Sequence, residues 1–223
     1  MLDAPGRPLR SVVTNRFVIG QVLVRPQAED TFLVCHRDDE PRGGLESFRR
    51  AEDAREIARV DDDGNYRPLK TAPNLRHGWR LELQTLAELE QALDYFYPGR
   101  LAVLDAWKEQ RLQITALRDT LNRQSGMYRV AATISDARLD EVVANFCRSN
   151  GGCLRTIIWR RNKARDVPSV KLPSMKFDPG FDQAGSNQIA DQERVHLSLL
   201  CQEACNLLVA ECRKAVKGSG SAT

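Results

Sequence analysis

Four cysteines in the second half of the sequence have the chemistry and spacing of a metal-binding set. Cys147 and Cys153 enclose five residues, and Cys201 and Cys205 enclose three. The second pair is predicted to lie on one face of a helix, because residues four apart are separated by about 6 Å along a helix axis. Thiolates bind zinc and iron–sulfur clusters. These cysteines are therefore the leading candidates for a functional site.

Spacing alone leaves three interpretations of this set open. Four thiolates are the usual ligands of a [4Fe–4S] cluster, and the glycines at 151–152 would let the backbone fold around an inorganic core. A structural zinc ion takes the same ligands, but its pairs usually enclose about two to four residues. Buried cysteines also pack as small apolar side chains. The spacing favours the cluster.

Other candidate residues receive simpler interpretations. Cys35 and Cys212 are expected to be core thiols, and the scattered histidines at 36, 77 and 196 to be structural or surface residues. A basic run follows the second cysteine: Arg155, Arg160, Arg161, Lys163 and Arg165. It is interpreted as a solvated face or a charge complement to an anionic cluster. Trp159 within it offers a third interpretation, in which the indole stacks on a nucleic-acid base.

The elements that must position these residues form two modules of an α+β protein. The first is predicted to be a small N-terminal mixed α/β domain with an antiparallel sheet. Its elements are a hairpin of strands Phe17–Val24 and Thr31–Cys35, a helix over Ser47–Arg59, a strand at Trp79–Leu83 and a helix after Thr85. Thr85 and Glu88 fit a capping box, in which each side chain satisfies an N–H at the helix start.

A long helix from about Leu101 to Arg123 is predicted to link this module to a mainly helical one. The second module is expected to contain a strand at Tyr128–Ile134, an amphipathic helix over Asp136–Asn150, an extended segment at Cys153–Trp159, a long loop over 160–192 and a helix from near His196 to about Lys217.

Composition excludes several classes of protein. Of 223 residues, 42% are hydrophobic and 28% are charged, which is typical of a globular chain. The sequence has no apolar run long enough to span a bilayer and no secretory signal, so we expect a cytoplasmic protein that does not contact membranes. A net charge of +3 gives little support for nucleic-acid binding. Nucleotide-binding glycine motifs and the nucleophile elbow are absent from the sequence.

Three segments resemble a bacterial two-domain family. The stretch from Asn65 to Arg76, with Gly78-Trp-Arg-Leu81, resembles a "stabilising" domain. Cys153–Trp159 and Cys205–Ala210 resemble the motifs of a 4Fe–4S cluster-binding domain. In relatives, both can be fused to a CbiX-type chelatase similar to sirohydrochlorin cobaltochelatase, a module for which this chain has no room. With the two modules named in this way, the predicted domains are a stabilising domain at 1–100, a linker helix at 101–127, a cluster-binding domain at 128–218 and a flexible tail at 219–223.

The resemblance also implies the cofactor and its ligands. It assigns one [4Fe–4S] cluster to Cys147, Cys153, Cys201 and Cys205, with Gln202 in place of the proline that relatives carry between the last two. We expect an electron-transfer or redox-sensing protein, not an enzyme on its own, that serves a redox partner such as a separate chelatase in tetrapyrrole or cobalamin metabolism. The alternative is a non-catalytic interaction module whose metal centre, cluster or zinc, is structural.

Overall fold

The computed structural model describes residues 9, 16–64, 75–148, 156–163, 165 and 195–219. The chain divides into two compact units, one made of residues 1–111 and 175–199 and the other of residues 112–174 and 200–223. A sheet and helices occur together, which confirms the predicted α+β class. None of the helices within these described ranges is long and apolar enough to cross a membrane.

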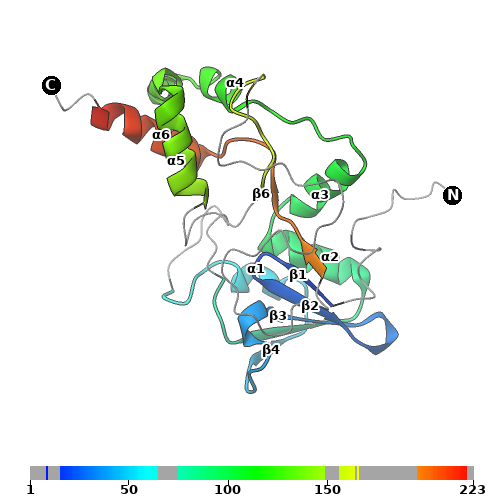
Figure 1. Ribbon diagram of the computed structural model, residues 1–223. Helices are drawn as coiled ribbons and strands as arrows, with labels where there is room; N and C mark the ends of the chain where they lie inside the picture. The colour runs from blue at the N-terminus through cyan, green and yellow to red at the C-terminus, as the bar shows by residue number, and fades with distance from the viewer. Residues whose placement is uncertain are drawn as a thin grey trace. The chain divides into compact units, whose positions relative to one another are not determined.

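A six-stranded sheet forms the centre of the first unit (Figure 1). Its strands stand in the order β4-β5-β3-β2-β1-β7. The inner pairings are antiparallel, whereas the outer strands β4 and β7 pair in parallel with their neighbours. The strands are β1 (Phe17–Ile19), β2 (Val22–Pro26), β3 (Phe32–His36), β4 (Glu46–Phe48), β5 (Trp79–Leu83) and β7 (Val195–Leu197). The predicted pairing of Thr31–Cys35 with the preceding strand and the predicted strand at Trp79 are confirmed.

The run from Phe17 to Val24 forms two strands, whereas one was predicted. The chain reverses at Gly20, which has a φ of +58°, a region that glycine enters at little cost. Tyr97 lies directly against this turn. Its Oη accepts the backbone N–H of Gln21 at 2.8 Å, and a Cβ at Gly20 would lie 2.5 Å from the same oxygen. The residues on both sides of Gly20 are rich in β-branched types, which favour strands, so the sequence pattern did not indicate this turn.

Helices α1 (Asp53–Ile57) and α2 (Leu86–Phe96) pack against each other and against β5 (Figure 1). The predicted helix over Ser47–Arg59 is wrong at its start, because Ser47 and Phe48 belong to β4 and pair with β5. Pairing of this segment with a neighbouring strand overrides its helical spacing.

The start of α2 has the predicted cap. The Thr85 hydroxyl accepts the N–H of Glu88 at 3.2 Å, and the Glu88 carboxylate accepts the N–H of Gln84 at 2.7 Å. The carboxylate therefore accepts the backbone N–H of the residue before the cap, and not the backbone N–H of Thr85 itself. Trp79 of β5 stacks on Phe96 of α2 with ring centroids 5.0 Å apart, so the C-terminal end of the helix packs on the sheet.

The prediction of one long linking helix from about Leu101 to Arg123 is wrong. Helix α3 (Arg100–Lys108) ends, and α4 (Leu117–Asn122) begins after an irregular segment. Gln110 has a φ of +58°; its N–H donates to the carbonyl of Trp107 at 3.0 Å, and that of Arg111 to the carbonyl of Ala106 at 2.9 Å. These bonds form a Schellman motif, which ends a helix. No glycine marks this position, so the sequence did not reveal the break.

The second unit is mainly helical around a two-stranded parallel sheet. Its elements are α4, the 3₁₀ helix η4 (Gly126–Thr133), α5 (Asp136–Arg148), β6 (Thr156–Ile157), β8 (Leu200–Cys201) and α6 (Asn206–Ser219). Helices α5 and α6 pack against each other (Figure 1). The amphipathic helix predicted from Asp136 is confirmed. The strand predicted at Tyr128–Ile134 is wrong, because most of this segment belongs to the 3₁₀ helix η4. A 3₁₀ helix has about three residues per turn, so Ala131 and Ile134 lie on the same side, and both are buried in one core.

The C-terminal helix begins later than predicted. Residues 195–197 pair with β1 as β7, and Leu200 and Cys201 pair with β6 as β8. The helix α6 starts only at Asn206. Val195, Leu197 and Leu199 alternate with polar residues, which is the period of a strand. Most of the predicted loop over 160–192 lies outside the described residues.

Candidate functional site

Three of the four predicted ligands lie on one hydrophobic core in the second unit. Cys147 is buried in the last turn of α5, while Cys201 and Cys205 pack against the same core and keep part of their surface exposed. The buried members of this core are Leu117, Leu121, Ala131, Ile134, Leu139, Val143, Cys147, Ile157, Trp159, Leu208, Val209 and Cys212. The fourth predicted ligand, Cys153, lies outside the described residues. The ligand assignment as a whole remains a prediction.

Cys201 is held by a strand. It is the last residue of β8, and its carbonyl accepts the backbone N–H of Ile158 at 3.0 Å. Its thiol donates to the carbonyl of Glu203 at 3.1 Å. The prediction that Cys201 and Cys205 share a helix face is therefore wrong, because the helix begins after both of them.

Cys205 occupies the N-cap of α6. Its carbonyl accepts the N–H of Val209 at 3.1 Å, and its Sγ accepts the N–H of Leu208 at 3.5 Å. The first turn of a helix carries N–H groups without helical partners and a partial positive charge. The Cys205 sulfur therefore lies beside these N–H groups, at the positive end of the helix.

Two ion pairs fix α5, the helix that carries Cys147. The Arg118 Nε donates to the Asp136 carboxylate at 3.0 Å, and the Arg161 Nε donates to the Asp140 carboxylate at 2.9 Å. The Arg118 hydrogen bond holds the pKa of Asp136 below its usual range. Both arginines thus attach the helix to segments that lie beside it in the second unit.

The basic run is not one continuous charged face. The side chain of Arg161 is 9% exposed and is bound to Asp140, while Arg160, Lys163 and Arg165 are exposed. Trp159 is 1% exposed and belongs to the core. The interpretation of Trp159 as a base-stacking residue is therefore wrong. Arg155 lies outside the described residues.

The remaining described cysteines are core residues. Cys212 is fully buried, and burial raises the pKa of its thiol to about 11. The neutral thiol is therefore favoured there, which suits packing better than ligation. Cys35 is buried in β3 of the first unit, beside Val18 and Leu23.

Sequence reasoning missed one group of polar side chains in the first unit. His36 and His77 were treated separately, but the structure places them with Asp39, and their ring centroids are 3.9 Å apart. His36 ends β3 and His77 precedes β5, and these strands are neighbours in the sheet. The sequence alone does not show that β3 and β5 are neighbours, and this strand order is the information needed to predict the group. The side chain of His196 is outside the described part of the chain.

The described thiols on the core supply the kind of donor that a [4Fe–4S] cluster requires. An apolar surround, thiol donors and a helix N-terminus also match an anionic cluster bound by cysteines.

Comparison with known proteins identifies both parts of the chain. Residues 7–111 match the family described as "DR2241 stabilising domain", and residues 109–214 match the family described as "4Fe-4S iron-sulfur cluster binding domain". The crystal structure of DR2241 from Deinococcus radiodurans superposes with a TM-score of 0.71 at 26% identity, over 94% of this chain and 40% of that one. That structure is described as a multi-domain protein with structural similarity to chelatases and two additional novel domains. No curated protein matches the chain.

These matches define the class as an iron–sulfur protein. The chain carries a DR2241 stabilising domain followed by a 4Fe-4S iron-sulfur cluster binding domain, which confirms the resemblance seen in the sequence. The cofactor of the second domain is a [4Fe–4S] cluster. The chain spans less than half the length of its solved relative, so the activity of that whole protein is not assigned to it.

Proposed function

We propose that this chain is an electron-transfer protein whose [4Fe–4S] cluster is held by Cys147, Cys153, Cys201 and Cys205. When bound, such a cluster supplies reversible one-electron chemistry. The four thiolates hold it in place. The residues around them set how readily charge is accommodated and how far water can approach.

The position of Cys205 carries this proposal. Its sulfur accepts a backbone N–H at the start of α6, so the helix stabilises additional negative charge at that ligand. Exclusion of water by the core around Cys147 favours the less charged state. The two effects oppose each other, and a centre balanced in this way is suited to cycling between two charges.

Exposure of the ligands supports exchange of electrons with a partner. Cys147 is 7% exposed and faces the core, while Cys201 and Cys205 are partly exposed. A redox partner would therefore approach the side of Cys201 and Cys205. We propose that this redox partner is a cytoplasmic protein. A separate tetrapyrrole–metal enzyme of the chelatase kind is the partner we propose, because the solved relative is described as similar to chelatases.

Redox titration of the anaerobically purified chain tests this function. Stepwise reduction with dithionite, followed by electron paramagnetic resonance and reoxidation, should show one electron taken up per cluster and full recovery. A matched variant, Arg59→Gln, changes an exposed cation of the first unit and should titrate as the parent does.

A structural role for the cluster is the second candidate, favoured by the placement of Cys147 inside the core. In that case reduction would decompose the cluster, and the second domain would lose its helical circular dichroism with it. Recovery after several cycles supports electron transfer, and loss of iron on the first reduction contradicts it.

A further inference from the structure

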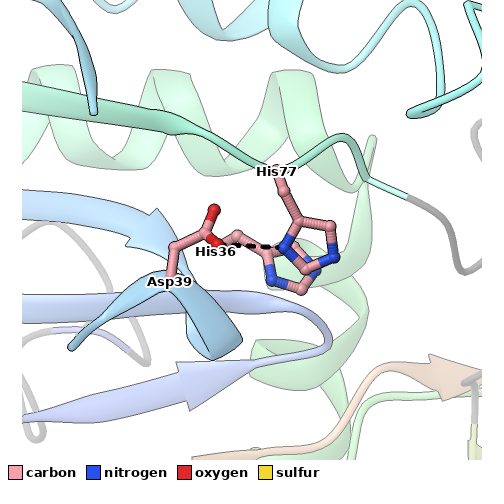
Figure 2. A group of neighbouring side chains, drawn as sticks. All are labelled: His36, Asp39 and His77. Atoms are coloured by element: carbon pink, nitrogen blue, oxygen red, sulfur yellow. Dashed lines mark hydrogen bonds and ion pairs between the residues drawn. The ribbon is translucent and has the colours of Figure 1, made fainter. Parts of the chain in front are cut away.

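Two histidines and one aspartate converge in the first unit, as Figure 2 shows. His36 ends β3, Asp39 lies in the 3₁₀ turn η3 (Arg37–Asp39) that follows, and His77 lies just before β5. Each offers one ligand atom, and the three atoms lie within 4.8 Å of one another. Chain segments far apart in the sequence thus bring two imidazoles and a carboxylate to one point.

Two members of the group are buried and the third opens it to solvent. His36 is 1% exposed, Asp39 is fully buried and the His77 side chain is 34% exposed. The Asp39 carboxylate is firmly oriented, because its Oδ2 accepts the N–H of Gly78 at 2.6 Å and its Oδ1 lies 3.0 Å from the Arg42 Nη1. The Arg42 side chain is 61% exposed and can move into water if another cation takes that oxygen.

His36 carries a nitrogen that the protein leaves unused. Its Nδ1 accepts the N–H of Asp38 at 3.2 Å, whereas its buried Nε2 has no hydrogen-bond partner among the residues that the structure describes. Burial, with the nearby His77, lowers the pKa of His36 to about 4, so the ring is neutral near pH 7. Buried polar atoms without a partner are rare and call for an explanation. A metal ion at Nε2 supplies one.

Each imidazole also has a carboxylate beside the nitrogen that would not bind the metal. The His77 Nδ1 contacts Asp39 Oδ1 at 3.1 Å, while its Nε2 lies 3.7 Å from Asp62 Oδ2. Asp62 is anchored by the backbone N–H of His77 at 2.6 Å. On the other ring, the His36 Nδ1 lies 3.7 Å from Asp38 Oδ2. Metal-binding histidines commonly donate their second N–H to a carboxylate, which fixes the tautomer.

We propose that His36, Asp39 and His77 bind one divalent first-row transition-metal ion such as Zn²⁺. Two imidazoles and one carboxylate suit this class of metal, whereas Mg²⁺ and Ca²⁺ prefer oxygen ligands only. The ion replaces the His77–Asp39 hydrogen bond. It requires each ring proton to lie on the far nitrogen, at His77 Nε2 and His36 Nδ1. The Asp38 N–H must then give up its hydrogen bond to His36 Nδ1. The carboxylates of Asp62 and Asp38 accept the two ring protons after a small movement. Solvent completes the coordination through the side opened by His77.

Metal titration of the cluster-loaded full chain tests the site without interference from the four thiols. Under anaerobic conditions, Co²⁺ should bind with one equivalent per chain and show visible d–d bands without thiolate charge-transfer bands. In long-range ¹⁵N spectra, Zn²⁺ should shift the ring nitrogens of His36 and His77 but not those of His196. Absence of binding, or equal shifts at all three histidines, would overturn the proposal and leave the group as a hydrogen-bonded network.

Zinc binding by variants of the proposed site provides a second test. His77→Gln should weaken Zn²⁺ binding at least tenfold. Asp62→Asn should weaken it about tenfold, the loss typical of a residue that orients a metal-binding histidine without touching the metal. His196→Gln, which removes the third histidine, should leave the affinity unchanged. Equal affinities in His77→Gln and the parent would contradict the site, and circular dichroism of each variant verifies that the fold is retained.

Discussion

The Sγ of Cys205 accepts the backbone N–H of Leu208 at 3.5 Å. A cysteine thus occupies the position where serine, threonine or aspartate usually caps a helix. The helix gains a cap, and the sulfur gains a donor and the positive end of the helix dipole. One residue therefore links the stability of α6 to the chemistry of the proposed cluster.

Replacement of Cys205 by serine should separate these two roles. Serine is a good N-cap, so we expect the free energy of unfolding of the metal-free protein to change by less than about 0.5 kcal/mol. The cluster, in contrast, should be largely lost, because the hydroxyl is a poor ligand for iron. Iron and sulfide content after anaerobic purification measures this.

Cys35→Ala is the matched control for that loss. Cys35 belongs to β3 of the first unit, whereas the predicted ligands belong to the second unit, so the variant should keep its iron and sulfide. Loss of the cluster in Cys35→Ala with the fold intact would show that the ligand set is wrongly assigned.

Arg161→Gln should destabilise the second unit. The Arg161 guanidinium is nearly buried against Asp140, and its removal leaves a carboxylate that is 22% exposed without its main partner. Hydrogen bonds to charged groups contribute about 1.5–3 kcal/mol, so we expect a loss of about 2 kcal/mol in denaturant unfolding. Arg160→Gln, at an exposed neighbouring position, should change stability by less than about 0.5 kcal/mol. Equal effects of the two substitutions would be inconsistent with the ion pair.

The stability of the first unit should fall as the pH drops below neutrality. The pKa of His36 is lowered from 6.5 to about 4 by burial, so the unfolded chain binds a proton at a pH where the folded chain does not. The stabilisation is complete above pH 6.5 and declines as the pH falls toward 4. Linkage gives a loss of about 2 kcal/mol at pH 5 relative to pH 8.

Denaturant unfolding with a chelator present, at several values of pH between 8 and 5, measures this loss. In His36→Gln the same interval should produce a much shallower decline, because no imidazole titrates at that position. Identical pH profiles for the variant and the parent would show that His36 does not control the transition.

Gly20→Ala should destabilise the β1–β2 hairpin. The added Cβ would lie 2.5 Å from the Tyr97 Oη, and the φ of +58° is unfavourable for alanine. We expect a cost of about 1–3 kcal/mol and a lower Tm. Gly43→Ala is the control, because nothing lies within 4 Å of its added Cβ. A Tm unchanged in Gly20→Ala would mean that Tyr97 can withdraw from the turn.

Local signals in the sequence predicted part of this fold. The cap formed by Thr85 and Glu88 and the alternation around Trp79 depend on neighbouring residues, and both elements were found where expected. The end of α3 at Gln110 could not be predicted, because its left-handed residue is not a glycine. The strand at 195–197 was missed although its alternation is visible, since the apolar residues after it also suit a helix.

The two candidate sites also differ in how far the sequence alone could predict them. The cysteines were proposed from their spacing, because a thiol set is conspicuous in sequence. Cys147 was expected on its helix, whereas the placement of Cys201 on a strand and of Cys205 at a cap was not foreseen. His36, Asp39 and His77 became a group only when β3 and β5 were known to be neighbours. Long-range strand order is set by packing of the whole unit, which single-sequence patterns do not encode.

Iron, sulfide and zinc analysis of the anaerobically purified full chain, together with a Cys201→Ala variant, tests the central claim most directly. The account predicts four iron and four sulfide per parent chain, as a [4Fe–4S] cluster requires, and loss of both in the variant. Zinc bound by the four thiols without sulfide, or full cluster content in Cys201→Ala, would contradict it.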